Sequence, residues 1–151
     1  MNARLPIAAA DCIFCKIVRR EAPASIVDED DRTLSFLDIR PINPGHILVI
    51  PKQHAAALAD LQPSLGGHLF ERAMATAAAL RRSGLRCEGV NVHVADGESA
   101  GQEVFHVHLH VFPRYRGDGL GLRVGPNYGR VADRKELDAV ATKVRAALTA
   151  H

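Results

Sequence analysis

The sequence predicts an α+β domain built on an antiparallel sheet, and three observations carry this prediction. Five short apolar or alternating segments have the pattern of strands, and turn-forming residues separate most of them. Helical patterns occur at three places, so the strict strand–helix alternation of a doubly wound parallel sheet is absent. The chain has 151 residues, which is the usual size of one domain.

The first third of the chain is expected to hold one short helix and three strands. The helix runs from Cys12 to about Arg20, and Asp11 is able to cap its first turn. The first strand begins at Ile26 and ends at an acidic turn, and the second covers the weakly alternating residues 33–37. The third strand is the β-branched run 46–50, because a proline follows it.

A long helix over residues 63–83 is the clearest element of the sequence. Pro63 suits a first helical position, where its missing N–H costs nothing. Gly84 is placed to end the helix in a left-handed conformation. Apolar residues recur at helical spacing, and Phe70 and Met74 are expected to widen their stripe; the stripe consists of Leu65, Leu69, Ala73, Ala77 and Leu80.

The second half is expected to add two strands and a terminal helix. The strands cover 90–94 and 104–112, and Pro113 ends the second of them. Four glycines between 117 and 125 indicate a tightly turned or mobile segment. A helix then starts near Asp133 and carries one apolar face, made of Leu137, Val140, Val144 and Leu148.

Composition excludes several classes of partner. The 19 basic and 17 acidic residues give a net charge of +2, which is too even for a protein that coats nucleic acid or an anionic membrane. No stretch approaches the ~20 apolar residues of a membrane span. Residues 1–10 hold an apolar run too short for a signal peptide, so we expect a disordered tail and a cytoplasmic protein.

Three histidines alternate with apolar residues between Val104 and Phe112. In a strand, His106, His108 and His110 share one face and their apolar neighbours share the other. Such a row suits either a transition-metal site or a histidine nucleophile. At ~3.3 Å per residue the row spans about 13 Å, too far for all three rings to bind one ion. Glu103 has the opposite parity, so the nucleophile is the favoured interpretation.

This segment, from Gly101 to Phe112, resembles the signature of the histidine-triad (HIT) family. The run from Asp38 to Lys52 is similar to the second signature of that family, and the residues around Phe14 to Ile17 and Glu29–Asp30 resemble its Hint-like branch. The resemblance covers about residues 12–116. It implies a HIT-like fold, a homodimer whose protomers each have a five-stranded antiparallel sheet, and hydrolysis or transfer of nucleotidyl groups from purine nucleotides.

The resemblance also implies a role for individual residues. His108 corresponds to the nucleophile that attacks the α-phosphorus and forms a nucleotidyl-histidine intermediate. His106 and His110 orient it, and His46 extends the proton network. Asp38 corresponds to the acceptor of the ribose hydroxyls, and Gly101 and Gln102 to the phosphate loop. An apolar slot for the base, for which ordinary core packing is the alternative, would consist of Phe14, Ile17, Phe36 and Ile39.

Two positions depart from the family pattern. Glu103 stands where Hint-like members usually have Ser or Thr, next to the phosphate loop. With Glu103 among the nucleotide-binding residues, an acid replaces a hydroxyl that could donate to the phosphate or the leaving group, and its charge could repel polyphosphate. Ala95 stands where some members carry Asn, which removes one polar contact on the phosphate side.

Cys12 and Cys15 are spaced to chelate one ion, although a bare dithiol or a redox pair would have the same spacing. The resemblance implies a structural zinc with His54 and His106 as the remaining ligands, and no organic cofactor. Cys87 is expected to be a small buried hydrophobe. The remaining histidines are expected to be solvated or structural; they are His68, His93 and His151.

Three functional hypotheses therefore remain. The first is a hydrolase or nucleotidyl transferase acting through His108 on a purine nucleoside phosphoramidate or dinucleoside polyphosphate. The second is a nucleotide-binding module of low turnover that acts through protein partners, and the third is a metal-dependent enzyme using the histidine row directly. Residues 11–116 would form the domain core, and the Gly-rich segment and helix of 117–151 would pack on the same domain.

Overall fold

The computed structural model describes residues 9–148, and these contain one five-stranded antiparallel sheet. The predicted α+β class is confirmed. The expected tail, residues 1–10, lies mostly outside the described residues, as does His151. In chain order the helices and strands are α1 (Ile13–Val18), β1 (Ile26–Glu29), β2 (Thr33–Leu37), β3 (Ile47–Pro51), α2 (Pro63–Arg82), β4 (Gly89–Val94), β5 (Leu109–Arg114) and α3 (Arg134–Leu148).

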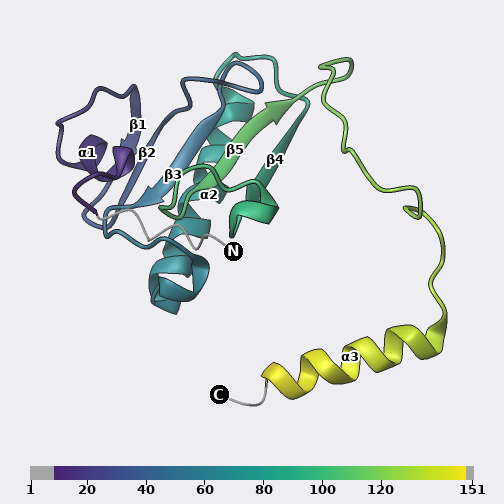
Figure 1. Cartoon of the computed structure of the whole chain (residues 1–151). Coiled ribbons are helices and arrows are strands. Elements are labelled where there is room, and N and C mark those ends of the chain that lie inside the picture. The colour runs from purple at the N-terminus through teal and green to yellow at the C-terminus, as the bar shows by residue number, and fades with distance from the viewer. Residues whose placement is uncertain (1–8, 149–151) are drawn as a thin grey trace. The chain divides into compact units, whose positions relative to one another are not determined.

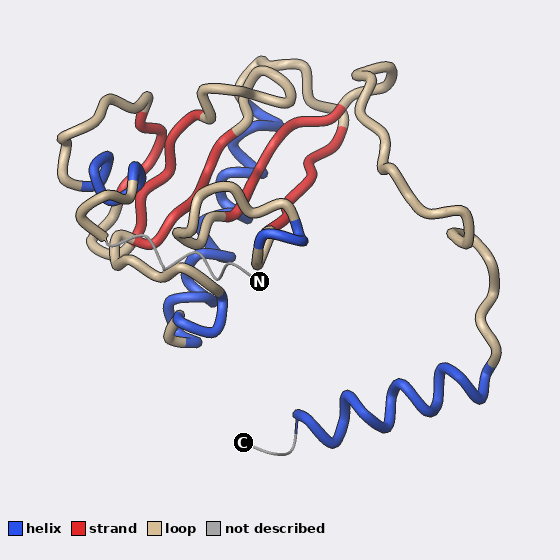
Figure 2. Tube along the Cα trace, viewed as in Figure 1, coloured by secondary structure: helices blue, strands red, loops and turns tan. Residues whose placement is uncertain are grey.

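The strand order across the sheet is β1-β2-β3-β5-β4, so the last strand of the sequence lies between β3 and β4 (Figures 1 and 2). The long helix α2 forms the connection between β3 and β4, and short 3₁₀ turns occupy Leu58–Asp60 and Glu98–Ala100. Placing β5 between β3 and β4 brings the histidine segment beside residues that lie far away in the sequence.

The two faces of the sheet carry separate hydrophobic clusters because side chains alternate along each strand. Ile47 and Val49 of β3 join α2, whereas Leu48 and Ile50 join the other cluster with α1. The α2 cluster also holds Val107, Leu109 and Val111. We call the opposite face, which packs against Phe14 and Cys15, the α1 face of the sheet.

Helix α2 begins and ends as the sequence predicts, but its apolar stripe is narrower. Pro63 occupies the first turn, and Gly84 has a φ of 83° just after the helix. Phe70 and Met74 do not widen the buried stripe, since 53% and 59% of their surfaces are exposed. Only one side of α2 touches the sheet, and Thr76 is buried there.

The last strand starts later than the sequence predicts. Residues 104–108 turn before β5, because the N–H of Val107 donates to the carbonyl of Ala55 (2.7 Å) and not to a ladder partner. Pro113 does not end the strand, which continues to Arg114 by pairing with β4. The ladder with β3 already stops at Val111, so the missing N–H of the proline is tolerated there.

The chain divides into two compact units, with the boundary after Gly119. The first unit holds the sheet together with α1 and α2. The second unit holds α3, whose bounds agree with the predicted terminal helix. The expected packing of residues 117–151 on the domain core stays a prediction, as do the homodimer and the cytoplasmic location. Within residues 9–148, no helix is both long enough and apolar enough to cross a membrane.

An ion pair and a hydrogen bond tie α2 to the β1–β2 hairpin. Asp28 pairs with Arg72, and Asp30 accepts a hydrogen bond from His68 (2.7 Å). Burial alone would raise the pKa of Asp30, but hydrogen bonds from Arg32, His68 and Thr33 outweigh it and hold that pKa well below its ordinary value. His68 is therefore structural, as expected.

Asp30→Asn should destabilise the fold by about 1–2 kcal/mol at pH 7, because a carboxylate with several donors is lost. The lowered pKa of Asp30 means that its contribution is complete above about pH 4 and is lost as the pH falls further. Urea unfolding at pH 7 and pH 3 should show the difference from wild type shrinking at the lower pH. Asp31→Asn, an exposed neighbour, is the control, and an equal effect of both variants would contradict this account.

Candidate functional site

The alternation of the histidine segment survives although only His110 lies in β5. His108 packs edge-to-face on Phe14, with ring centroids 5.2 Å apart, and its ring lies 4.8 Å from that of His110. His106 also contacts Phe14. All three imidazoles thus gather on the α1 face, as the sequence predicts, while Val107 belongs to the α2 cluster.

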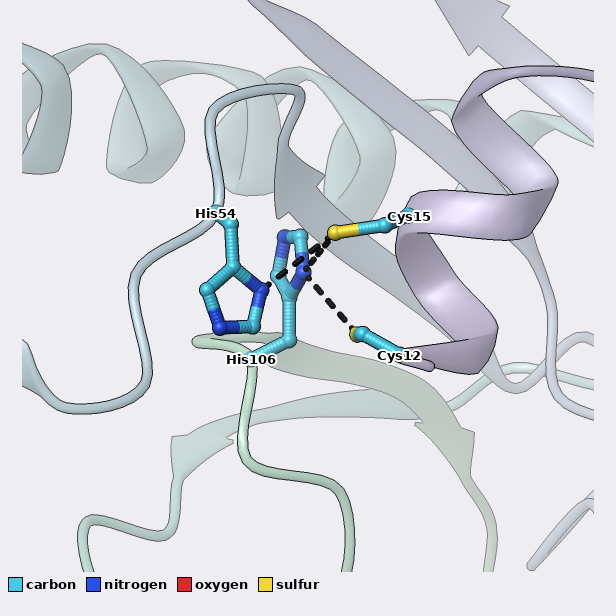
Figure 3. Close-up of side chains that lie close together, drawn as sticks. All are labelled: Cys12, Cys15, His54 and His106. Atoms are coloured by element: carbon cyan, nitrogen blue, oxygen red, sulfur yellow. Dashed lines mark hydrogen bonds between the residues drawn. The ribbon is translucent and has the colours of Figure 1, made fainter. Parts of the chain in front are cut away.

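Cys12, Cys15, His54 and His106 form a compact cluster between α1 and the segment before β5 (Figure 3). Nδ1 of His106 lies 3.5 Å from the sulfur of each cysteine, and Nδ1 of His54 lies 3.3 Å from Cys15 Sγ. One ligand atom from each residue lies within 4.8 Å of all the others. Sequence spacing alone could not bring His54 and His106 to the cysteines.

The chemistry of this cluster fits a divalent zinc ion. Two sulfurs and two imidazole nitrogens are the donor set of a tetrahedral structural site. Nε2 of His106 donates to the carbonyl of Pro51 (2.8 Å), so the lone pair of its ring lies on Nδ1, facing the sulfurs. Burial, reinforced by Cys12, raises the pKa of the Cys15 thiol to about 11, so a cation would be needed to stabilise its thiolate.

The His108 ring is held by one hydrogen bond. Its Nδ1 donates to the backbone carbonyl of His106 at 2.7 Å, so Nε2 carries the lone pair. Only 6% of the residue is exposed, yet Nε2 has no hydrogen-bond partner in the described part of the chain. Because every fully buried side-chain nitrogen among residues 9–148 has a partner, Nε2 must reach solvent. Burial lowers the pKa of His108, against the opposing effects of the His106 carbonyl, Asp38 and Glu103.

A chain of hydrogen bonds defines the tautomers of His46 and His110. The backbone N–H of Ile42 donates to Nδ1 of His46 (3.1 Å), so the proton of neutral His46 is on Nε2. That proton is donated to Nδ1 of His110 at 2.9 Å. Neutral His110 then carries its own proton on Nε2. Burial and the neighbouring imidazoles of His108, His93 and His46 lower the pKa of His110 to about 3, which keeps it neutral.

Asp38 lies near this chain, with Oδ2 3.8 Å from His46 Nε2. Asp38, His46 and His110 together have a spacing that could hold an ion. However, His46 Nε2 must keep its proton while Nδ1 accepts from Ile42, so this nitrogen is not available as a ligand. The arrangement is a hydrogen-bond relay and gives no support to a metal-dependent use of the histidine row.

Gly45 allows His46 to enter the site. Its φ of 98° favours glycine, and a Cβ there would lie 2.9 Å from Leu85 Cδ1 and 3.1 Å from Leu80 Cδ2. The side chain of Asn43 donates to the carbonyl of Pro113 (2.9 Å) and to Asp118 (3.0 Å), which ties the same loop to the end of β5. The relay through His46 therefore depends on a loop packed against both α2 and β5.

His93 is a member of the site that sequence reasoning missed. It lies opposite His110 in the β4–β5 ladder, and the two rings stack with centroids 4.4 Å apart and planes within 2°. The sequence predicts a solvated or structural role for this residue. The cross-strand register with β5 is the only signal that identifies it, and register was not available from sequence.

The expected base-binding residues differ in exposure. Phe14, Ile17 and Phe36 are buried in the α1-face core, and the rings of Phe14 and Phe36 pack 5.4 Å apart. Ile39 is 91% exposed, beside Asp38. The use of these residues for a base stays a prediction, since the first three already have a structural role.

The predicted phosphate loop is ordered by Gln102. Its Oε1 accepts from Gly97 (2.8 Å), and its amide donates to the carbonyls of Ala56 and Val104. Gln102 is thus a buried brace, and a direct phosphate contact by its side chain stays a prediction. Gly101 has a left-handed conformation in the same turn. Within residues 9–148, the backbone N–H groups of Glu103 and Val104 have no acceptor.

Comparison with protein families is consistent with this geometry. The HIT domain model matches residues 19–117. A HIT-like protein of unassigned role from Borreliella burgdorferi is 44% identical over 116 residues, covering 76% of this chain and 84% of that protein. Adenylylsulfatase HINT3 of Arabidopsis thaliana is 38% identical over 111 residues, covering 73% of this chain and 55% of that protein.

Solved structures share the fold. A HIT family protein from Bacillus subtilis superposes with a TM-score of 0.83 at 35% identity, covering 93% of this chain and 99% of that one. A zinc-bound histidine triad family protein from Mycobacterium smegmatis has a TM-score of 0.73 at 41% identity, with coverage of 93% and 99%. A histidine triad nucleotide-binding protein from Candida albicans has a TM-score of 0.80 at 32% identity, with coverage of 91% and 97%.

The hydrogen bonds predict which nitrogen carries the proton in four of the imidazoles. His108 should be protonated on Nδ1, and His46, His106 and His110 on Nε2. Two-bond ¹H–¹⁵N correlation spectra at neutral pH, with each signal assigned by a single His→Gln variant, measure this directly. Protonation of His108 on Nε2 would contradict the geometry described above.

Proposed function

Because this chain belongs to the HIT domain family, we propose that it hydrolyses or transfers nucleotidyl groups from purine nucleotides through a nucleotidyl-histidine at His108. The observation that carries this proposal is the hydrogen bond from His108 Nδ1 to the His106 carbonyl. This bond orients the ring and directs the lone pair of a neutral imidazole, on Nε2, toward solvent.

In the first step, the Nε2 lone pair forms a bond to the α-phosphorus. The bond from phosphorus to the leaving group breaks, and its electron pair goes to the leaving group, which takes a proton from solvent. In the second step, water attacks the same phosphorus and loses a proton to solvent. The electron pair of the nitrogen–phosphorus bond then returns to Nε2, so that His108 is regenerated. Two easier displacements replace one difficult displacement.

His110 would assist by offering its Nε2–H to a phosphoryl oxygen. The ring is held on one nitrogen by His46 and on one face by His93, so this donor is oriented before substrate arrives. The backbone N–H groups of Glu103 and Val104 are further donors for the phosphoryl group, because nothing in the described protein accepts from them. Asp38 would accept hydrogen bonds from the ribose hydroxyls.

The relatives support the substrate class. One relative is named an adenylylsulfatase and one structural neighbour a nucleotide-binding protein, and both resemble this chain over most of its length. The leaving group that we propose is an amine, as in a purine nucleoside phosphoramidate, or a further nucleotide, as in a dinucleoside polyphosphate.

We further propose that the four-residue cluster binds a structural zinc ion, through Cys12, Cys15, His54 and His106. Bound there, the ion would supply cross-linking of the fold and no step of the reaction. The zinc-bound structural neighbour from Mycobacterium smegmatis supports this assignment. The cluster joins α1, the loop after β3 and the segment before β5, so it would stabilise the backbone that carries the His106 carbonyl.

His108→Gln should lower kcat for an adenosine 5′-phosphoramidate by at least about 10³-fold, because it removes the nucleophile. Nucleotide affinity, measured by calorimetry with AMP, should change by less than about threefold since the contacts to ribose and base remain. Quenching at alkaline pH, where the nitrogen–phosphorus bond is stable, followed by mass spectrometry should find the nucleotidyl adduct on His108 of the wild type only.

His68→Gln replaces an imidazole outside the site and is the matched control. Turnover of the His108 variant within tenfold of wild type would overturn the proposed function. So would a wild type that turns over no phosphoramidate or dinucleoside polyphosphate at all.

Cys12→Ser should reduce bound zinc from about one ion per chain toward none and lower Tm by roughly 5–10 °C, because a ligand of a structural site is lost. Metal content is measured by plasma mass spectrometry, and Tm by calorimetry. Cys87→Ser, outside the cluster, should change neither quantity. Purified wild type without zinc after growth in zinc-supplemented medium would remove the zinc proposal and leave the nucleophile proposal intact.

A further inference from the structure

An exposed ion pair lies at the rim of the histidine site. Nη2 of Arg40 donates to Oε2 of Glu103 at 2.8 Å, and both side chains are largely exposed, at 79% and 74%. Arg40 follows β2 and its backbone N–H donates to Asp38 Oδ1 (2.8 Å). Glu103 follows the buried Gln102 and precedes the nucleophile segment. The pair therefore joins the loop after β2, which also carries Asp38, to the loop that leads into the histidine segment.

The charges around the site sum to a negative value. Asp38 and Glu103 contribute two carboxylates, and Arg40, which contacts both residues, contributes one guanidinium. Glu103 lies five residues before His108, and its own backbone N–H is one of the donors proposed above for the phosphoryl group. The phosphoryl group of a substrate would add another negative charge to this surface.

We propose that Glu103 selects the leaving group by its charge, so that amine leaving groups carrying an ammonium are favoured over anionic ones such as a phosphate chain. This inference rests on the proposed nucleotidyl transfer at His108 and narrows its substrate class to phosphoramidates of cationic amines. Glu103 is a specificity-determining residue here, with Arg40 as the cation that its carboxylate holds until substrate arrives.

Because the Arg40–Glu103 pair is exposed, replacing the Arg40 guanidinium with a substrate ammonium costs little free energy. Exposed ion pairs contribute little to stability, so an incoming ammonium can take the place of the Arg40 guanidinium at low cost. An anionic leaving group has the opposite effect. It would have to draw Arg40 away and leave Glu103 unpaired beside the α-phosphoryl group and Asp38, where like charges repel. The same pair therefore attracts one class of leaving group and resists the other.

Three adenosine 5′-phosphoramidates of similar size test the inference. They derive from 1,2-diaminoethane, propylamine and β-alanine, and thus end in an ammonium, a methyl group and a carboxylate. Each amide has its own chemical reactivity, so the readout is the kcat/KM ratio of the ammonium to the carboxylate substrate, compared between wild type and variants. Glu103→Gln, which keeps the backbone N–H, should lower this ratio by about tenfold.

Arg40→Gln should raise the ratio, because it leaves Glu103 without its neutralising partner. Glu21→Gln is the matched control, since this exposed carboxylate is paired with Arg19 at 2.8 Å after α1 and should leave the ratio unchanged. Raising the salt concentration from 0.05 to 0.5 M should bring the wild-type ratio toward that of Glu103→Gln, because screening weakens exposed charges.

A ratio within twofold of wild type in Glu103→Gln, or a lower ratio in Arg40→Gln, would overturn the inference. The proposed function is judged separately, by the uncharged propylamine substrate. If wild type cleaves that substrate and His108→Gln does not, the function stands whatever the charge dependence. If wild type cleaves none of the three phosphoramidates and no dinucleoside polyphosphate, the function itself has failed.

Discussion

The geometry of the site depends on His106, because its ring contacts the cysteine cluster and its backbone carbonyl orients His108. The ring is entirely buried, and its Nε2–H is donated to the carbonyl of Pro51, which turns Nδ1 toward Cys12 and Cys15. The carbonyl of the same residue accepts Nδ1–H of His108. One residue therefore connects the sulfur–imidazole cluster to the orientation of the nucleophile, and movement of either would disturb the other.

Burial explains why several imidazoles can lie together. Protonated rings at these distances would repel one another, but desolvation lowers the pKa of His46, His106, His108 and His110, and neutral rings can donate and accept in sequence. The backbone N–H of Ile42 determines which nitrogen of His46 and of His110 carries the proton, whereas backbone carbonyl acceptors determine it for His106 and His108. The proposed chemistry uses the Nε2 atoms of two rings, the lone pair of His108 and the N–H of His110.

The residues around the buried imidazoles are of two kinds, buried side chains that support the site and exposed side chains near it. Gln102, expected to face phosphate, holds the loop with its whole amide group, and Phe14 and Phe36 are core residues whose packing supports His108. Ile39, Arg40 and Glu103 are exposed at the rim. Chemistry therefore depends on buried groups, whereas selectivity is assigned to groups that can move at little cost.

The sequence by itself determined the sheet, the alternation of His106, His108 and His110 with apolar residues, and the position of α2, because side-chain direction repeats locally along strands and helices. It could not determine that β5 starts at Leu109, that Phe70 and Met74 are exposed, or that His93 stacks on His110. Each of those features depends on which segment, distant in the sequence, packs against the residue concerned. The tertiary structure alone decided them, since hydrogen-bond partners, strand register and burial are properties of the assembled neighbours and not of local spacing.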